Sequence, residues 1–89
     1  MSEPLVIWTL PLGSAAELRL SLDTFNGNAR ADLRTWADYQ AGPALIRGPT
    51  KKGVSIPLTS LGEAAAALAE ADRKARDLGL IQQEGRKAA

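Results

Sequence analysis

An Asn-Gly pair at residues 26 and 27 separates two runs of alternating apolar and polar residues, and it constrains the fold more than any other feature. Both residues tolerate the positive φ angles of the tight turns that join antiparallel strands. The first run, ELRLSLDTF at 17–25, places Leu18, Leu20 and Leu22 on one side and its polar residues on the other. The sequence therefore predicts a β-hairpin whose leucine side is the core face.

The run after the pair, NARADLRTW at 28–36, must pair antiparallel with the first run. Its alternation sends four small or apolar residues to the core face, namely Ala29, Ala31, Leu33 and Thr35. The outer face gathers charged and aromatic side chains from both runs: Arg19, Phe25, Arg30, Asp32, Arg34 and Trp36. We therefore expect one face of the sheet to mix guanidinium groups with aromatic rings.

Two further strands flank the hairpin in the sequence. Residues 4–12 are rich in β-branched and aromatic types and end near Pro11 and Gly13, which suits an edge strand followed by a turn at 13–16. The stretch QAGPA at 40–44 breaks the pattern, and a last strand starts with ALIRG and runs past Lys51 to Ile56, before Pro57. The predicted sheet thus has four strands.

A single helix is predicted over residues 60–78, because leucines and alanines recur there at helical spacing. Ser60 and Glu63 form a capping-box pattern at its start, and Gly79 is a natural residue to end it. Two i,i+4 pairs, Glu70 with Lys74 and Asp72 with Arg76, mark a solvated face. We predict an α+β fold in one domain, residues 1–89, with flexible ends at about 1–3 and 80–89.

The length of the chain favours self-association. A domain of 89 residues buries only about 60–65% of the surface that its unfolded chain exposes, so its core is thin. The helix also carries an apolar seam, including Leu61, Leu68 and Leu78, that is wider than one small sheet needs. We therefore expect a homodimer.

The composition excludes several classes of function. The sequence has no cysteine and no histidine, so thiol and imidazole catalysis and the common zinc sites are absent, and we expect neither an enzyme nor a cofactor. Its apolar stretches are far too short to span a bilayer, and the start of the chain has Glu3 but no basic segment of a secretory signal. We expect a cytoplasmic, nucleoid-associated protein without a membrane partner.

The charge is modest but unevenly distributed. The formal net charge is +1, while residues 17–52 hold six basic and four acidic side chains, an excess of +2. A basic pair, Lys51-Lys52, precedes Gly53 and the last part of the predicted strand. A phosphate-binding surface is compatible with this pattern, although it is far less basic than a typical DNA-binding domain.

Seven residues are candidates for binding a single-stranded nucleic acid, because such sites combine cations that follow the phosphates with aromatic rings on which bases stack. They are Arg19, Phe25, Arg30, Arg34, Trp36, Lys51 and Lys52. Five of the candidates have a structural alternative. Phe25 and Trp36 could serve packing, Arg34 could pair with Asp32 or Asp23, and the two lysines could protect a strand edge from aggregation.

The order and spacing of these residues resemble a known family. The stretch from RLSLDTFNGNARADLRTW through KKGVSIPLTSLGEAAAAL is similar to the single-stranded-DNA-binding domain of the transcriptional coactivator positive cofactor four and of its small bacterial and phage relatives. The resemblance covers residues 5–75. It implies a strongly curved four-stranded antiparallel sheet with one C-terminal helix, a homodimer, and nucleic-acid contacts at Phe25, Arg34, Lys51 and Lys52.

The chain departs from the family pattern at four positions. The resemblance implies lysines beside the hairpin glycine where this chain has Asn26 and Asn28, a basic residue where it has Asp23, and an aromatic residue where it has Ala37. These departures should weaken binding, although Arg19 and Arg30 could restore part of the charge.

The sequence therefore leads to the hypothesis of a homodimer that binds single-stranded DNA, melted duplex or RNA with little sequence preference. Association with the transcription or replication machinery follows from the resemblance only. The alternative is an interaction module whose sheet face binds a partner protein.

Overall fold

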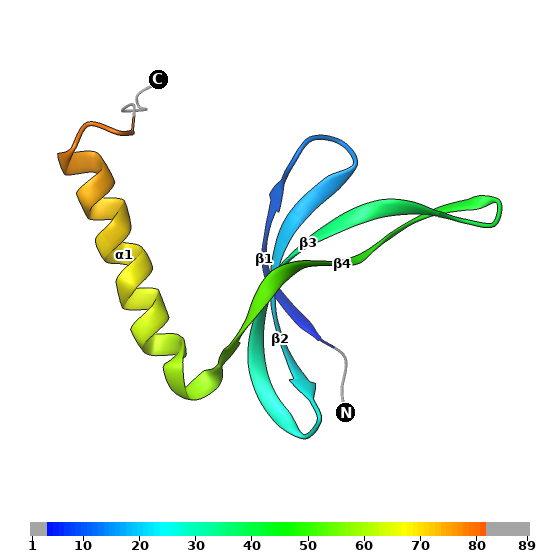
Figure 1. The fold of residues 1–89 in the computed structure, drawn as a ribbon, viewed down its shortest axis with the longest axis horizontal. Helices are drawn as coiled ribbons and strands as arrows, with labels where there is room; N and C mark the ends of the chain where they lie inside the picture. The colour runs from blue at the N-terminus through cyan, green and yellow to red at the C-terminus, as the bar shows by residue number, and fades with distance from the viewer. Residues whose placement is uncertain (1–3, 82–89) are drawn as a thin grey trace. The chain divides into compact units, whose positions relative to one another are not determined.

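The computed structural model describes residues 4–81 and confirms the predicted α+β fold. Its strands form one antiparallel sheet in the order in which they occur in the chain (Figure 1): β1 (Leu5–Pro11), β2 (Ala16–Phe25), β3 (Asn28–Ala41) and β4 (Ala44–Pro57). A 3-10 turn, Leu58–Ser60, leads into the helix α1 (Leu61–Asp77).

The chain forms two compact units, Met1–Thr59 with the sheet and Ser60–Ala89 with the helix. The ends predicted to be flexible lie largely outside the described residues, and the prediction of a single domain stays a prediction.

The Asn26-Gly27 hairpin forms as the sequence predicts. Asn26 has φ 54° and Gly27 has φ 81°, the pair of positive angles that defines a two-residue turn between twisted antiparallel strands. From this turn β2 and β3 pair without interruption, from Phe25 opposite Asn28 to Ala16 opposite Ala37. Because the register never slips, the predicted separation of an apolar and a polar face holds along the whole pair.

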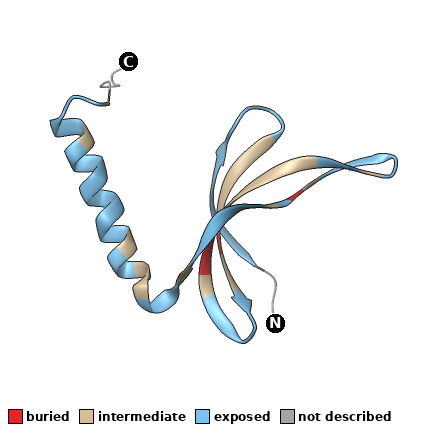
Figure 2. Cartoon of the chain, in the orientation of Figure 1, coloured by how far each residue is buried: buried red, intermediate tan, exposed pale blue. Residues whose placement is uncertain are grey.

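Burial within the chain is shallow, and few of the described side chains are buried. Ala31 is the only apolar side chain that is buried among the described residues, and the leucines of β2 are only half-buried (Figure 2). On the other face, Ser21 and Asp32 are 2% and 5% exposed. The face predicted as a core face therefore lies on the expected side of the sheet but has large exposed side chains at its margins, such as Leu5 and Val54.

Strand β4 contains a bulge that the sequence did not reveal. Pro49 pairs with Trp36 and Gly53 pairs with Arg34, so the three residues Thr50–Lys52 lie opposite Thr35 alone. The Thr50 hydroxyl stabilises this bulge, because it donates to the Thr35 carbonyl at 2.8 Å and accepts from the Lys52 amide at 3.1 Å. The basic pair thus lies on an irregular segment of the strand, a type of feature that is over-represented next to functional sites.

Gly53 closes this bulge by bringing two backbones together. A Cβ at this position would lie 2.6 Å from the Arg34 Cβ and 2.6 Å from the Leu33 carbonyl oxygen. No side chain fits there unless the backbone of β3 or β4 moves. The glycine after the two lysines is therefore required by the close approach of the strands.

The helix begins and ends close to the predicted residues, but its N-terminus differs from the prediction. Ser60 is the N-cap and makes no side-chain hydrogen bond, so the predicted capping box is wrong. Its ψ of 1° follows from the preceding 3-10 turn, whereas a capping side chain needs an extended backbone to reach the free amides. At the other end the prediction is confirmed: Gly79 has φ 73°, and the amides of Gly79 and Leu80 donate to the carbonyls of Arg76 and Ala75.

Ion pairs on the helix agree with the prediction in one case of two. Asp72 pairs with Arg76 at 3.2 Å, as expected, whereas Glu70 pairs with Arg73 instead of Lys74. Among the described residues, no helix combines the length and the apolar character that crossing a membrane requires.

The close contact at Gly53 gives the first prediction. Gly53→Ala should lower the free energy of unfolding by about 1–3 kcal/mol, because the added methyl group must push β3 and β4 apart. The matched control is Gly62→Ala on α1, where a Cβ would meet nothing within 4 Å, and which should stabilise the protein by about 0.5–1 kcal/mol. Urea denaturation of the three proteins measures both effects, and equal stability of Gly53→Ala and the wild type would contradict the account of the bulge.

Candidate nucleic-acid interface

The polar face of the sheet is built from alternate residues of three adjacent strands. Cross-strand partners share a face, and the register places Arg19 opposite Arg34, Asp23 opposite Arg30, and Asp32 between Ser21 and Ser55. We use the term polar face for the following residues: Glu17, Arg19, Ser21, Asp23, Phe25, Arg30, Asp32, Arg34, Trp36, Asp38, Arg47 and Ser55. Five of the seven predicted site residues belong to it, and they meet as the alternation of the sequence predicts.

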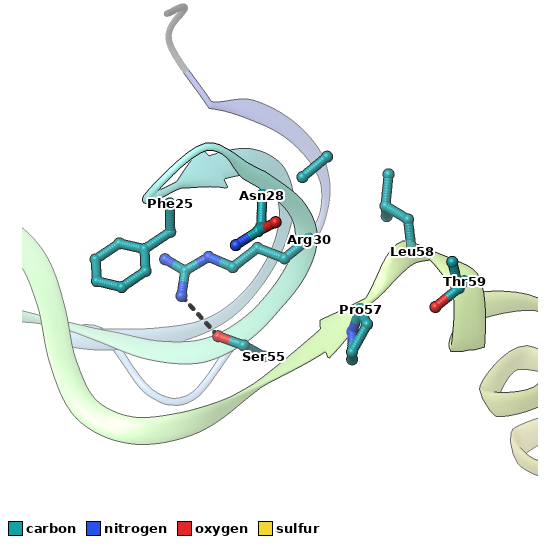
Figure 3. A pocket seen from close by; sticks show the side chains of 8 residues that line it. Phe25, Asn28, Arg30, Ser55, Pro57, Leu58 and Thr59 are labelled. Atoms are coloured by element: carbon teal, nitrogen blue, oxygen red, sulfur yellow. Dashed lines mark hydrogen bonds between the residues drawn. The ribbon is translucent and has the colours of Figure 1, made fainter.

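Two hollows open along this face, each of about 470 Å³, which is a volume typical of small-molecule sites. The Phe25 hollow is lined by Phe25, Asn28, Ala29, Arg30, Ser55, Pro57, Leu58 and Thr59 (Figure 3). The Trp36 hollow is lined by Pro4, Ser21, Asp23, Arg30, Asp32, Arg34, Trp36, Pro49, Thr50 and Lys51. Arg30 borders both hollows, so they form neighbouring parts of one surface. Lys51 also lines the Trp36 hollow, whereas Lys52 lines neither.

Arg30 joins an acid, a hydroxyl group and an aromatic ring at the hairpin end of the face. Its Nε and Nη2 donate to the two carboxylate oxygens of Asp23, at 2.7 and 3.4 Å, and its Nη1 donates to the Ser55 hydroxyl at 2.8 Å. Its Cζ lies 4.7 Å from the centre of the Phe25 ring, and Figure 3 shows the guanidinium beside that ring. The Asp23 carboxylate raises the pKa of Arg30, so the guanidinium stays charged. Phe25 itself is 56% exposed.

The same arrangement occurs a second time around Trp36. Arg19 donates through Nε to Glu17 at 2.8 Å, and its Cζ lies 3.8 Å from the centre of the Trp36 ring. The indole Nε1 of Trp36 is buried and has no hydrogen-bond partner among the described residues. Trp36 is thus neither a simple core residue nor an open platform, because a cation covers the ring.

Arg34 lies at the centre of the face and links it to the bulge of β4. It binds both carboxylate oxygens of Asp32, with the shortest contact at 2.8 Å, and donates through Nη1 to the Thr50 carbonyl at 2.9 Å. The hydrogen bonds from Arg34 hold the pKa of Asp32 below its usual 3.8, although burial opposes this shift. Arg34 thus pairs with Asp32, which is one of the structural alternatives that the sequence offered. Its guanidinium is partly used in bonds within the protein.

Arg47 belongs to the polar face although the sequence did not single it out. It donates to Asp38 at 2.7 Å, to Glu17 at 2.9 Å and to the Ser14 carbonyl at 2.9 Å. The hydrogen bond from Arg47 lowers the pKa of Asp38, and hydrogen bonds from Arg19 and Arg47 lower the pKa of Glu17. The signal that could have revealed Arg47 is its position opposite Asp38 across the break at 40–44.

Each arginine of the sheet is therefore paired with a carboxylate. Four arginines and four acids of the described sheet residues neutralise one another: Arg19, Arg30, Arg34 and Arg47 with Glu17, Asp23, Asp32 and Asp38. Lys51 and Lys52 make no ion pair with another described residue. Within residues 4–81 no group of three potential ligands gathers that could hold a metal ion. The positive charge that the sheet offers to a ligand thus comes mainly from the bulge.

The buried carboxylate gives a prediction about pH. Since the folded pKa of Asp32 is below the usual 3.8, its pairing stabilises the fold above that value and is lost as the pH falls through the folded pKa. Urea denaturation between pH 7 and pH 2.5 should show constant stability at the upper end and a decline below about pH 4. Asp32→Asn should lose about 1–3 kcal/mol at pH 7 and show a shallower acid decline. Asp72→Asn, which breaks an exposed helix pair, should change stability by less than about 0.5 kcal/mol, and an equal loss in both variants would contradict this account.

Known proteins resemble this chain in structure but not closely in sequence. No protein-family model matches the chain, and no curated protein is significantly similar to it. A PC4 homologue from Burkholderia pseudomallei aligns at a TM-score of 0.62 and 20% identity, over 79% of this chain and 98% of that chain in a tetragonal crystal form. Its orthorhombic form gives the same TM-score and identity over 82% and 95% of the two chains.

A more distant alignment is with the bacteriophage T5 homologue of the eukaryotic transcription coactivator PC4, a protein implicated in recombination-dependent DNA replication. It has a TM-score of 0.48 and 22% identity, over 88% of this chain and 98% of that chain. The two alignments with the Burkholderia pseudomallei protein show that the fold of this chain resembles that of a PC4 homologue, the family that the sequence motifs resemble.

Proposed function

We propose that this protein is a homodimer that binds single-stranded DNA with little sequence preference, through the polar face of its sheet. The observation that supports the proposal most is the arrangement around Phe25. This exposed ring lies in a hollow next to a guanidinium, and the same arginine borders a second hollow that Lys51 also lines. Single-strand binders use this combination, because bases stack on rings while cations follow the phosphates. The fold shared with PC4 homologues is consistent with it.

The geometry favours an unpaired strand over a duplex. A base can reach the Phe25 ring only when it is unstacked and turned toward the hollow, which single strands and melted regions allow. Neither hollow presents a set of groups arranged to read one particular base, since the carboxylates and guanidinium groups bind one another. The ligand is therefore a single strand of mixed sequence, with RNA as a second substrate that the same stacking would accept.

The same ion pairs argue against catalysis. The four carboxylates of the polar face are bound by arginines, and the sequence contains no histidine or cysteine that could act as a base or nucleophile. The protein acts by binding, in the cytoplasm, within transcription or replication complexes at the nucleoid.

The other face of the sheet supports self-association. It carries large apolar side chains that remain exposed within the chain, including Leu5 at 60%, Trp8 at 45% and Val54 at 57%. Exposed apolar surface of this kind marks an interaction site. A second copy of the chain is the expected partner, because a thin core gains stability when a dimer buries this surface. The same face also favours the alternative function, an interaction module for another protein.

Assembly can be measured directly. Light scattering at micromolar concentration should give the mass of two chains, each of 9.4 kDa. Leu20→Asp, on the apolar face of β2, should dissociate and unfold the protein, because a charge would be buried at the interface. A monomer mass for the wild type would favour the interaction module.

Binding is tested by titrating a labelled oligothymidylate with the protein at several salt concentrations. With Lys51 and Lys52 as the unneutralised cations, log K should fall with log salt at a slope of about −1.4 per protomer in contact with the strand. Duplex DNA of the same length should bind more weakly. A slope near zero, or no preference for the single strand, would contradict the proposal.

Phe25→Ala separates stacking from ionic attraction. It should weaken binding of the oligothymidylate by about 1–3 kcal/mol at an unchanged salt slope. The matched control is Tyr39→Ala, which removes a ring of similar exposure from the opposite face of β3, 53% against 56%, and should leave affinity unchanged. If Phe25→Ala lowers the melting temperature by several degrees but the folded protein binds normally, Phe25 is a packing residue.

A further inference from the structure

Each aromatic ring of the polar face has an arginine over one of its two sides. The Arg30 guanidinium lies over Phe25 at 4.7 Å, and the Arg19 guanidinium lies over Trp36 at 3.8 Å. A base cannot stack on the covered side of either ring while the cation stays in place. Any ligand that uses this side must first move an arginine.

A carboxylate from β2 anchors each of these arginines. Asp23 lies directly opposite Arg30 and binds its Nε and Nη2, while Glu17 lies opposite Trp36 and binds the Nε of Arg19. The same unit, an acid that holds an arginine over a ring, thus occurs twice along the strand pair. The anchoring carboxylates are also partly shielded from water, with side-chain exposures of 17% for Asp23 and 15% for Glu17.

All three guanidinium nitrogens of Arg30 donate a hydrogen bond within the protein, which leaves one N–H on each Nη atom for a ligand. Nε and Nη2 bind Asp23, and Nη1 binds the Ser55 hydroxyl. A phosphate that binds these remaining N–H groups lies close to the negative charge of Asp23, and the two anions repel each other. To bind the phosphate with Nε and Nη2 together, Arg30 must leave Asp23, and the same movement would uncover Phe25.

We propose that Asp23, and Glu17 in the second unit, are gating residues that set the affinity of the polar face for single strands. This inference rests on the proposed function and concerns its regulation. The carboxylate competes with phosphate for Arg30, and displacing it couples phosphate binding to exposure of the stacking ring. Because the competing charge belongs to the protein, Arg30 adds little to the salt dependence of binding in the wild type.

The experiment compares Asp23→Asn with the wild type in the oligothymidylate titration. Removal of the carboxylate charge should tighten binding roughly three- to tenfold at about 0.1 M salt, a change typical of a charge-assisted contact. The slope of log K against log salt should steepen by about 0.7, since one more phosphate is neutralised. Glu17→Gln should act in the same direction through Arg19, and it supplies the test if Asp23→Asn does not fold.

The charge-matched control is Asp72→Asn, which also raises the net charge by one but frees an arginine on α1 that faces no ring. It should leave affinity and slope within about twofold of the wild type. If Asp23→Asn and Glu17→Gln bind with the same affinity and salt slope as Asp72→Asn, Asp23 and Glu17 are not gating residues, although the proposed function stands. If neither the wild type nor any variant binds the oligonucleotide, the proposed function fails and the gate with it.

Discussion

The ion pair between Asp32 and Arg34 holds the polar face together. Asp32 is 5% exposed, and a charge at that depth is tolerated only when it is paired and hydrogen-bonded. Arg34 meets this requirement with two nitrogens and uses the third to bind the Thr50 carbonyl, which fixes the start of the bulge in β4. The close approach at Gly53 fixes its other end. The position of Lys51 beside the Trp36 hollow thus depends on a pair whose two charges already neutralise each other.

The two faces of the sheet use their side chains for different purposes. The apolar face leaves leucine, valine and tryptophan side chains exposed, while the polar face buries Ser21 and Asp32 and neutralises its arginines one by one. Such a polar face attracts polyanions weakly at long range, because attraction over distance follows net charge. The binding that we propose for it must therefore rest on short-range contacts, in which stacking and the exchange of one anion for another decide the affinity.

The sequence predicted the fold well because its signals are local. The Asn26-Gly27 turn fixes the register of β2 with β3, and alternation then assigns every side chain of that pair to a face. The same logic placed Arg19, Phe25, Arg30, Arg34 and Trp36 together. The capping box at Ser60 failed because the preceding 3-10 turn changes the backbone angles of Ser60, an effect that residue types do not show.

The features that the sequence did not reveal depend on contacts across strands. Nothing in the spacing of Lys51 and Lys52 shows that they lie in a bulge, since the bulge follows from the approach of Gly53 to Arg34. The sequence also does not show that Asp23 holds Arg30 over Phe25, or that Glu17 holds Arg19 over Trp36. Where several charged residues are neighbours, only the side-chain geometry shows which arginine an acid binds.

The central claim is that the polar face is the binding surface, and nuclear magnetic resonance of the labelled protein tests it most directly. Adding oligothymidylate should shift the Nε resonances of Arg19, Arg30 and Arg34 and the ring resonances of Phe25, which is the only phenylalanine in the sequence. The methyl resonances of Leu18 and Leu20, on the apolar face, should stay in place. Shifts confined to those leucines would contradict the account, and so would binding that leaves the arginine resonances unchanged.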